Sequence, residues 1–178
     1  MNLVFLGGSL RPASLNRRLM GYLAREAEKG GHSVQVFQGE DLRLALYEDG
    51  LAVPAPVVAM AAALQAAQGV VIVSPEYNAG IPGHLKNAVD WLSVQRPSPW
   101  TGLPALMAAA SPGAFGGARG LLAWRATLAN LGCWVAPAAI TVPLADRNLA
   151  EDGTPVEERT AAEIQRTLHA FLARSIRG

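Results

Sequence analysis

Short apolar runs alternate along the chain with segments in which apolar residues recur at helical spacing. The runs Leu3–Leu6 and Val70–Val73 are uninterrupted, which is typical of strands buried on both faces. Further strands are predicted over residues 33–37, 103–109 and 134–142. Pro137 in the last run indicates an edge position or an interruption, because proline cannot donate a hydrogen bond to a neighbouring strand.

Segments with helical spacing separate these strands. In the first, apolar residues recur at every fourth position from Leu15 to Ala27, and Gly30-Gly31 then ends the pattern. Other helices are predicted over residues 57–67, 81–94 and 118–131, with a last one, beyond a polar loop over 143–155, that buries Ile164, Leu168, Phe171 and Leu172. This alternation predicts one α/β domain over residues 1–178, with a parallel sheet and helices on both faces.

Composition and charge narrow the class of protein. The chain of 178 residues is 51% apolar and 16% charged, which excludes a disordered protein. Its net charge of +1 provides no field to attract nucleic acid. The longest apolar stretch, residues 51–64, contains two prolines and is too short to span a membrane, and Met1–Leu6 is too brief for a signal peptide. With Cys133 as its single cysteine, the chain is expected to be cytoplasmic and without a membrane partner.

In such a sheet the loops from strand to helix lie at one edge, where ligands bind. The first loop lacks the glycine spacing of the dinucleotide fingerprint and the lysine of the P-loop. It carries Ser9, Arg11, Ser14 and Asn16 at the start of a helix, where free N–H groups and the helix dipole favour an anion. We therefore predict a phosphate site; the alternative is that Ser14 is only a helix cap and Arg11 a solvated side chain.

The second loop combines a restrained backbone with an aromatic side chain. Pro75 and Pro82 restrict the backbone, and Gly80 and Gly83 are expected to free it. Such a loop can offer backbone N–H groups to a planar heterocycle with Tyr77 packed beside it. The alternative is a turn with a surface tyrosine.

The third loop, residues 111–118, is rich in glycine. We expect Gly113, Gly116 and Gly117 to let a ring approach closely and to keep one of its faces open. Taken alone, the loop is only a glycine-rich connection. Because all three loops follow central strands, they predict one site with a phosphate end and a ring end.

These loops resemble those of the NAD(P)H-dependent FMN reductases of flavodoxin-like fold, which include quinone, chromate and azo-compound reductases. The resemblance spans nearly the whole domain, and the motif of the second loop is the most specific. The shared residues are Gly8-Ser9-Leu10-Arg11, Ser14 and Asn16, then Ser74–Asn78, Ile81–Gly83 and Leu85–Trp91, and finally Ser111–Gly113 and Gly116-Gly117.

The resemblance implies a three-layer sandwich whose five-stranded parallel sheet has the order 2-1-3-4-5, with FMN and NAD(P)H as cofactors. It implies that FMN phosphate binds to Ser9, Arg11, Ser14 and Asn16. The residues that it implies around the flavin ring are Pro75, Glu76, Tyr77 and Asn78, with Ser111, Gly113, Gly116 and Gly117 nearby. It also implies a homodimer or homotetramer in which the helix that ends at Trp91 lies at an interface beside the flavin.

We therefore predict an enzyme that reduces a small acceptor, such as a quinone, chromate, an azo compound or free flavin, by two-electron ping-pong transfer. The flavin carries the chemistry, so no catalytic side chain and no metal ligand is assigned. The rival is a flavodoxin-type carrier of single electrons. Such carriers tend to be strongly acidic, whereas this chain has a pI near 8.0, which favours the enzyme. Cys133 is expected to be a small apolar residue and not a nucleophile.

Overall fold

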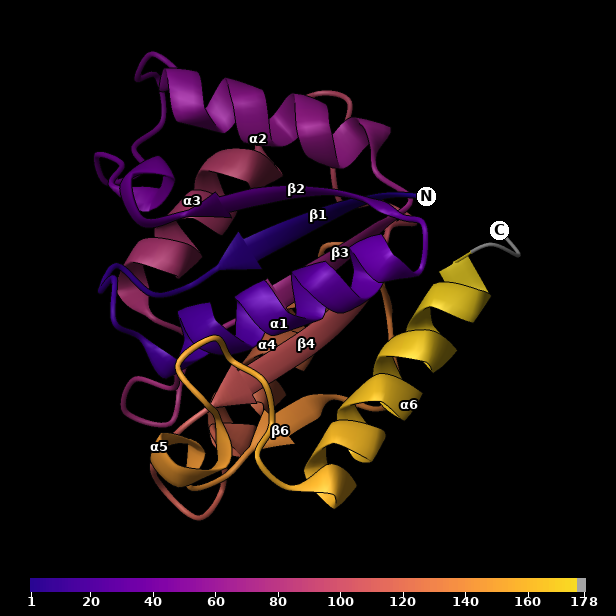
Figure 1. Ribbon diagram of the computed structural model, residues 1–178. Coiled ribbons are helices and arrows are strands. Elements are labelled where there is room, and N and C mark those ends of the chain that lie inside the picture. The colour runs from indigo at the N-terminus through magenta and orange to yellow at the C-terminus, as the bar shows by residue number, and fades with distance from the viewer. Residues whose placement is uncertain (176–178) are drawn as a thin grey trace.

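A parallel sheet forms the centre of the protein in the computed structural model, which describes residues 1–175 (Figure 1). Its strands are β1 (Asn2–Gly7), β2 (Ser33–Gln38), β3 (Gly69–Val73), β4 (Pro104–Ala110) and β5 (Trp134–Val135). They are ordered β2-β1-β3-β4-β5, and each pair is parallel. This is the flavodoxin-like order that the resemblance implies, so the predicted fold class is confirmed.

The edge strand is divided in two. β5 pairs with the start of β4, while β6 (Ile140–Val142) pairs with its end, so both pieces extend the sheet on the same side. Between them the carbonyl oxygens of Ala136 and Pro137 accept hydrogen bonds from the Arg125 guanidinium, at 3.0 and 3.1 Å. The interruption that Pro137 predicts within residues 134–142 is therefore present.

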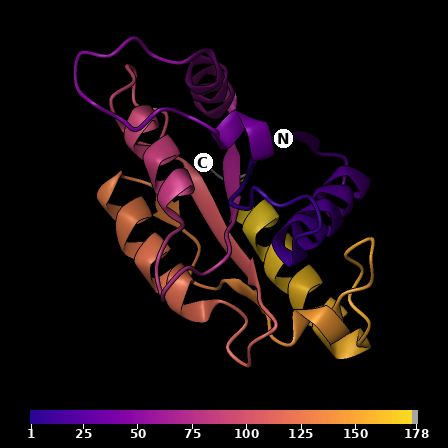
Figure 2. The ribbon, with the colours of Figure 1, turned by 90° about the vertical axis from the view of Figure 1, so that its left-hand side faces the viewer.

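Helices cover both faces of the sheet, and Figure 2 shows the three layers. The helical elements are α1 (Leu15–Lys29), the 3₁₀ turn η1 (Gly39–Leu42), α2 (Ala55–Ala66), α3 (Gly83–Ser93), α4 (Ala118–Asn130), α5 (Ala145–Asn148) and α6 (Glu158–Ser175). α1 and α6 pack on one face, and α2, α3 and α4 pack on the other. The short helix α5 lies within residues 143–155, where the sequence predicts only a loop.

Two apolar cores result, because alternate residues of each strand point to opposite faces. In β1, Val4 and Leu6 belong to the core beneath α2, α3 and α4, whereas Leu3 and Phe5 belong to the core beneath α1 and α6. β3 alternates in the same way and is buried at every position. The continuous apolar runs of the sequence thus arise because the sheet is covered on both sides. No helix within residues 1–175 is long and apolar enough to cross a membrane.

Candidate functional site

Three loops meet at the carboxyl edge of the sheet, after β1, β3 and β4. Backbone hydrogen bonds join them: Gly8 N–H donates to Val73 O at 2.8 Å, and Ser74 N–H donates to Ala108 O at 2.9 Å. Ser111 N–H donates to Val142 O at the end of the next strand. The loops that the sequence predicts to share one edge are therefore neighbours.

The first loop presents polar groups that the protein itself does not use. Ser9 is 2% exposed and Arg11 is exposed, and neither side chain has a hydrogen bond or ion pair with any described residue. The Ser14 hydroxyl caps α1 by accepting from Asn16 N–H at 3.2 Å, which leaves its own O–H available to donate. These donors lie at the N-terminal end of a 15-residue helix, where an anion is favoured.

Asn16, by contrast, is engaged inside the protein. Its amide nitrogen donates to Ala110 O at 2.8 Å, and its amide oxygen accepts from Ala110 N–H at 2.9 Å. The side chain is buried, so it fastens the start of α1 to the end of β4. Asn16 thus positions the first loop, and because its amide nitrogen carries a second N–H, its contact with phosphate stays a prediction.

The second loop contains a tight turn. Tyr77 N–H donates to Gly80 O at 3.1 Å, and Gly80 N–H donates to Tyr77 O at 2.9 Å. The two central residues, Asn78 and Ala79, have φ values of +50° and +61°. The sequence suggests that Gly80 takes the unusual backbone conformation of this turn. In the structure Asn78 and Ala79 take the left-handed conformation instead. Tyr77, beside the turn, is 47% exposed.

Glu76 anchors the second loop to α4. Its carboxylate accepts hydrogen bonds from Arg119 Nε at 2.9 Å and from Gly120 N–H at 3.1 Å, and it forms an ion pair with Arg119 Nη2 at 2.6 Å. Desolvation acts to raise the pKa of Glu76, but the hydrogen bonds from Gly120 and Arg119 outweigh it and hold the pKa below its ordinary value. A Cβ at Gly120 would lie 3.2 Å from Glu76 Cβ, so a side chain there would push the two segments slightly apart.

His84 connects the first loop to α3. Its Nε2 lies 2.9 Å from Gly8 O, and because a carbonyl oxygen only accepts, Nε2 is the donor. Its ring meets the Tyr77 ring edge-on, with centroids 6.1 Å apart. His84 therefore holds two loops in register, a role that its place in the sequence does not reveal.

The third loop is built differently from what its glycines suggest. Gly116 and Gly117 are buried with φ values of +58° and +86°. A Cβ at Gly116 would lie 2.8 Å from Pro143 N, and one at Gly117 would lie 2.7 Å from Ala109 Cβ. These two glycines thus fit the loop onto β6 and β4, which corrects the expectation that they keep a ring face open. Gly113 alone is exposed, with only Ser111 Oγ near its missing side chain.

Phe115 of this loop is an exposed aromatic residue to which the sequence pattern assigns no role. Phe115 is 70% exposed, and the Arg119 guanidinium carbon lies 6.0 Å from the centre of its ring. Arg119 is held in turn by Glu76. A large aromatic side chain among glycines and alanines is the signal that was available in the sequence.

The helix after the second loop holds another loop of the same chain. Asn87 accepts from Tyr47 N–H at 2.8 Å and donates to Ala45 O at 2.9 Å, and Trp91 Nε1 donates to the same carbonyl. Trp91 is buried within the chain, so its side chain packs inside the protomer, and an interface on α3 stays a prediction for the other residues of this helix. The outward side of α3 carries an ion pair between Lys86 and Asp90.

The thiol of Cys133 is not activated for reaction. Burial raises the pKa of its thiol to about 12, and its sulfur lies 3.3 Å from Trp100 O. A thiolate is therefore scarce near neutral pH, which agrees with the apolar role that the sequence predicts.

The protein has a flavodoxin-like sheet, hydrogen-bond donors without a protein acceptor after β1, and fixed turns after β3 and β4. This combination is typical of the flavin-binding α/β class. The profile of the family described as NADPH-dependent FMN reductase matches residues 1–146, which is most of the chain. The chain belongs to this family.

Individual relatives agree with this assignment. The chain is 42% identical over 127 residues to a quinone reductase of Escherichia coli strain K12, an alignment that spans 67% of this chain but only 64% of the relative. It is 31% identical over 172 residues to a quinone reductase of Pseudomonas putida, covering 92% and 89% of the two chains. The solved structure of FerB, a flavoenzyme NAD(P)H:(acceptor) oxidoreductase from Paracoccus denitrificans, matches with a TM-score of 0.86 at 30% identity, over 98% of this chain and 96% of that one.

Proposed function

We propose that this protein binds FMN at the three-loop edge and uses NAD(P)H to reduce a small acceptor, such as a quinone, chromate, an azo compound or free flavin. The observation that carries the proposal is the donor set of the first loop. The side chains of Ser9, Arg11 and Ser14 donate no hydrogen bond to any described residue, although Ser9 and Ser14 are buried. Hydroxyl and guanidinium donors that have no protein acceptor and lie at the N-terminal end of a helix fit a bound phosphate.

The residues present fit the two ends of FMN. Arg11 would contribute a charge-assisted contact to the phosphate, and Ser9 and Ser14 would donate their hydroxyl protons. Asn16 holds the loop on Ala110, and its second amide N–H would donate to the phosphate. The ring would lie against the turn of the second loop and the exposed part of the third, with these residues around it: Pro75, Glu76, Tyr77, Asn78, Ser111 and Gly113.

When bound, FMN supplies a ring that accepts a hydride and passes on two electrons. The chain's part is to fix the ring's surroundings. Glu76 already pairs with Arg119 and Gly120, so its carboxylate holds the loop and is not assigned to proton transfer. We infer that no side chain of this site acts as a required acid or base.

We further infer that NAD(P)H and the acceptor use the same open face in turn. The buried glycines of the third loop close that loop onto β4 and β6, so access is left beside Gly113 and Tyr77, both of which are exposed. Two ligands that exclude each other at one place give ping-pong kinetics.

The experiment that tests the proposal is anaerobic mixing of the FMN-loaded protein with NADH and, separately, with NADPH. We expect one nicotinamide or both to bleach the flavin absorbance stoichiometrically before any acceptor is added. Steady-state rates with benzoquinone should then give parallel double-reciprocal lines. Failure of both nicotinamides to bleach the flavin over minutes would contradict the enzyme and favour a carrier that depends on a partner reductase. Bleaching with intersecting lines would contradict only the shared face.

We also propose a homodimer or homotetramer in the cytoplasm. Exposed apolar side chains occur directly after α3, on α4 and in the loop before α4, at Val94, Leu122 and Phe115, and apolar surface of this kind often marks association. The cytoplasmic proposal rests on the single cysteine. Light scattering of the FMN-loaded protein measures the assembly, and an active monomer at micromolar concentration would contradict it.

A further inference from the structure

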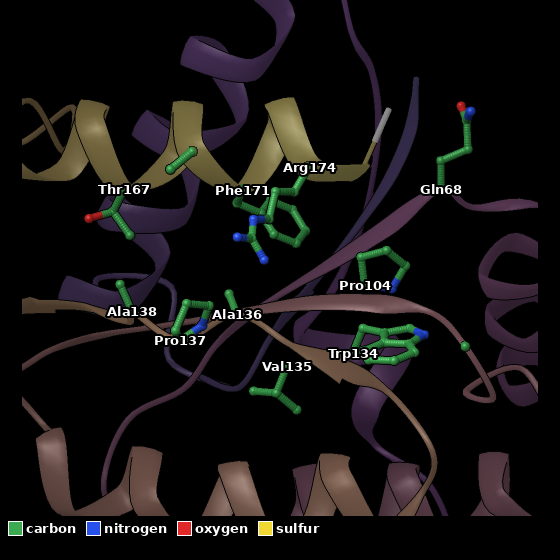
Figure 3. A pocket seen from close by; sticks show the side chains of 12 residues that line it. Gln68, Pro104, Trp134, Val135, Ala136, Pro137, Ala138, Thr167, Phe171 and Arg174 are labelled. Atoms are coloured by element: carbon green, nitrogen blue, oxygen red, sulfur yellow. The ribbon is translucent and has the colours of Figure 1, made fainter. Parts of the chain in front are cut away.

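A cavity of about 720 Å³ lies at the opposite edge of the sheet from the three loops (Figure 3). It opens between the start of β4, the edge strand β5 and the C-terminal half of α6. Small-molecule sites in proteins commonly enclose about 300–1,000 Å³, so the volume is that of a ligand site. The apolar side chains that form its walls include Pro104, Trp134, Val135, Pro137, Ala170 and Phe171.

The cavity exists because the edge strand is broken. β5 pairs with β4 over two residues only, and the chain leaves the ladder at Ala136 and Pro137 before β6 begins. On this face the sheet is covered by α1 and α6, and α6 packs against β4 and β6, so the short β5 is left uncovered. Small side chains at 136–138 keep the space open.

An unusual tryptophan borders this space. Trp134 is 75% exposed, whereas Trp91, Trp100 and Trp124 are at most 2% exposed. Its indole lies at the cavity beside Pro104 (Figure 3). A flat aromatic surface that is open to solvent is well suited to stack on a planar ligand.

Among the described residues that line the cavity, Arg174 alone is charged. Its guanidinium extends from α6 into the cavity, toward β5 (Figure 3). It makes no hydrogen bond or ion pair with any described residue. A guanidinium beside apolar walls binds a carboxylate or similar group more strongly than one in bulk water, because fewer waters compete for it.

We propose that this cavity is a second binding site, for a small organic anion with a flat apolar body. The aromatic part would stack on Trp134 and the walls, and the acidic group would pair with Arg174. The site is separate from the three-loop edge: β4 runs from Pro104 at the cavity to Ala110 at the other edge, a distance of roughly 20 Å for seven residues. Its occupation therefore does not depend on the proposed reductase reaction.

The test is isothermal titration calorimetry on the FMN-loaded protein with naphthalene carboxylate and with its uncharged analogue, naphthalene carboxamide. We expect one carboxylate per chain and about tenfold weaker binding of the carboxamide. Arg174→Gln should weaken carboxylate binding about tenfold and leave carboxamide binding unchanged. Arg166→Gln, a substitution at an exposed arginine of the same helix outside the cavity, is the matched control and should change neither.

A second pair of variants locates the site without removing charge. Ala170→Phe should fill the cavity and abolish binding of both probes, whereas Ala162→Phe, at an exposed position of α6 outside the cavity, should not. Circular dichroism would show that both variants keep the fold. The proposal is overturned if Ala170→Phe binds as the unmodified protein does, if NADH displaces the carboxylate, or if light scattering shows that Ala170→Phe dissociates an oligomer, since a second copy would then cover the cavity.

Discussion

The first loop and the two loops beside it use their polar side chains in opposite ways. In the first loop, Ser9 and Arg11 have no partner among the described residues. In the second, Glu76 already accepts two hydrogen bonds from α4 and pairs with the Arg119 guanidinium, and its neighbouring turn is closed by two backbone hydrogen bonds. In the third, Gly116 leaves no room for a side chain.

The difference shows how the site divides its work. Unpaired donors are available to a charged ligand, whereas paired side chains and buried glycines fix the shape of the backbone. A substitution in the first loop should therefore change ligand affinity and leave the fold intact. A substitution at a paired side chain or a buried glycine of the other two loops, such as Glu76 or Gly116, should act first on the fold.

The largest effect is expected from Gly116→Ala. The new Cβ would meet backbone atoms of Val142 and Pro143, at the end of β6, at 2.8 to 3.0 Å, and Gly116 has a φ of +58°. Overpacking and a left-handed alanine together should lower the free energy of unfolding by about 2–4 kcal/mol. Urea unfolding followed by circular dichroism measures the change.

Gly113→Ala is the matched control in the same loop. Its Cβ would meet only Ser111 Oγ at 3.5 Å, so the free energy of unfolding should change by no more than about 0.5 kcal/mol. Equal destabilisation by the two alanines would break the distinction between a buried and an open glycine.

Next in size is the effect of Arg11→Ala on FMN binding. Loss of a charge-assisted contact, worth roughly 1.5–3 kcal/mol, should lower the affinity for FMN about 10- to 100-fold and leave the fold intact. Riboflavin has no phosphate, so its affinity should hardly change. Flavin fluorescence titrations measure both, and Arg166→Ala on α6 controls for net charge. If the substitution lowers the affinities for FMN and riboflavin equally, the phosphate does not bind at Arg11.

The smallest effect is expected from Glu76→Gln, and it depends on pH. The pKa of Glu76 is lower in the folded protein than its ordinary value of 4.5, so the ionised carboxylate stabilises the fold above that value. That contribution is lost as the pH falls through the lowered pKa. Because Arg119 is largely exposed, Glu76→Gln should cost about 1 kcal/mol or less at pH 7, and less still at acid pH. Unfolding free energies compared at neutral and acid pH test this, and a difference that grew on acidification would contradict it.

Much of the fold was predictable because the relevant signals are local. The run Val70–Val73 and the spacing from Leu15 to Ala27 identify a buried strand and an amphipathic helix without reference to the rest of the chain. Pro137 indicated the break in the edge strand for the same reason. The helix α5 was missed because its four residues are too few to show a period.

The sequence by itself determined the order of the elements, the edge at which the loops gather and the residue types that fit a phosphate. Only the tertiary structure decided which polar groups stay unpaired. Asn16 is hydrogen-bonded to Ala110, 94 residues away, and Glu76 is hydrogen-bonded to Gly120, 44 residues away. The cavity at Arg174 likewise needs α6 to lie across a sheet edge formed 40 residues earlier. Periodicity reports the environment of each segment, whereas a hydrogen-bond partner or a cavity depends on which distant segments pack together.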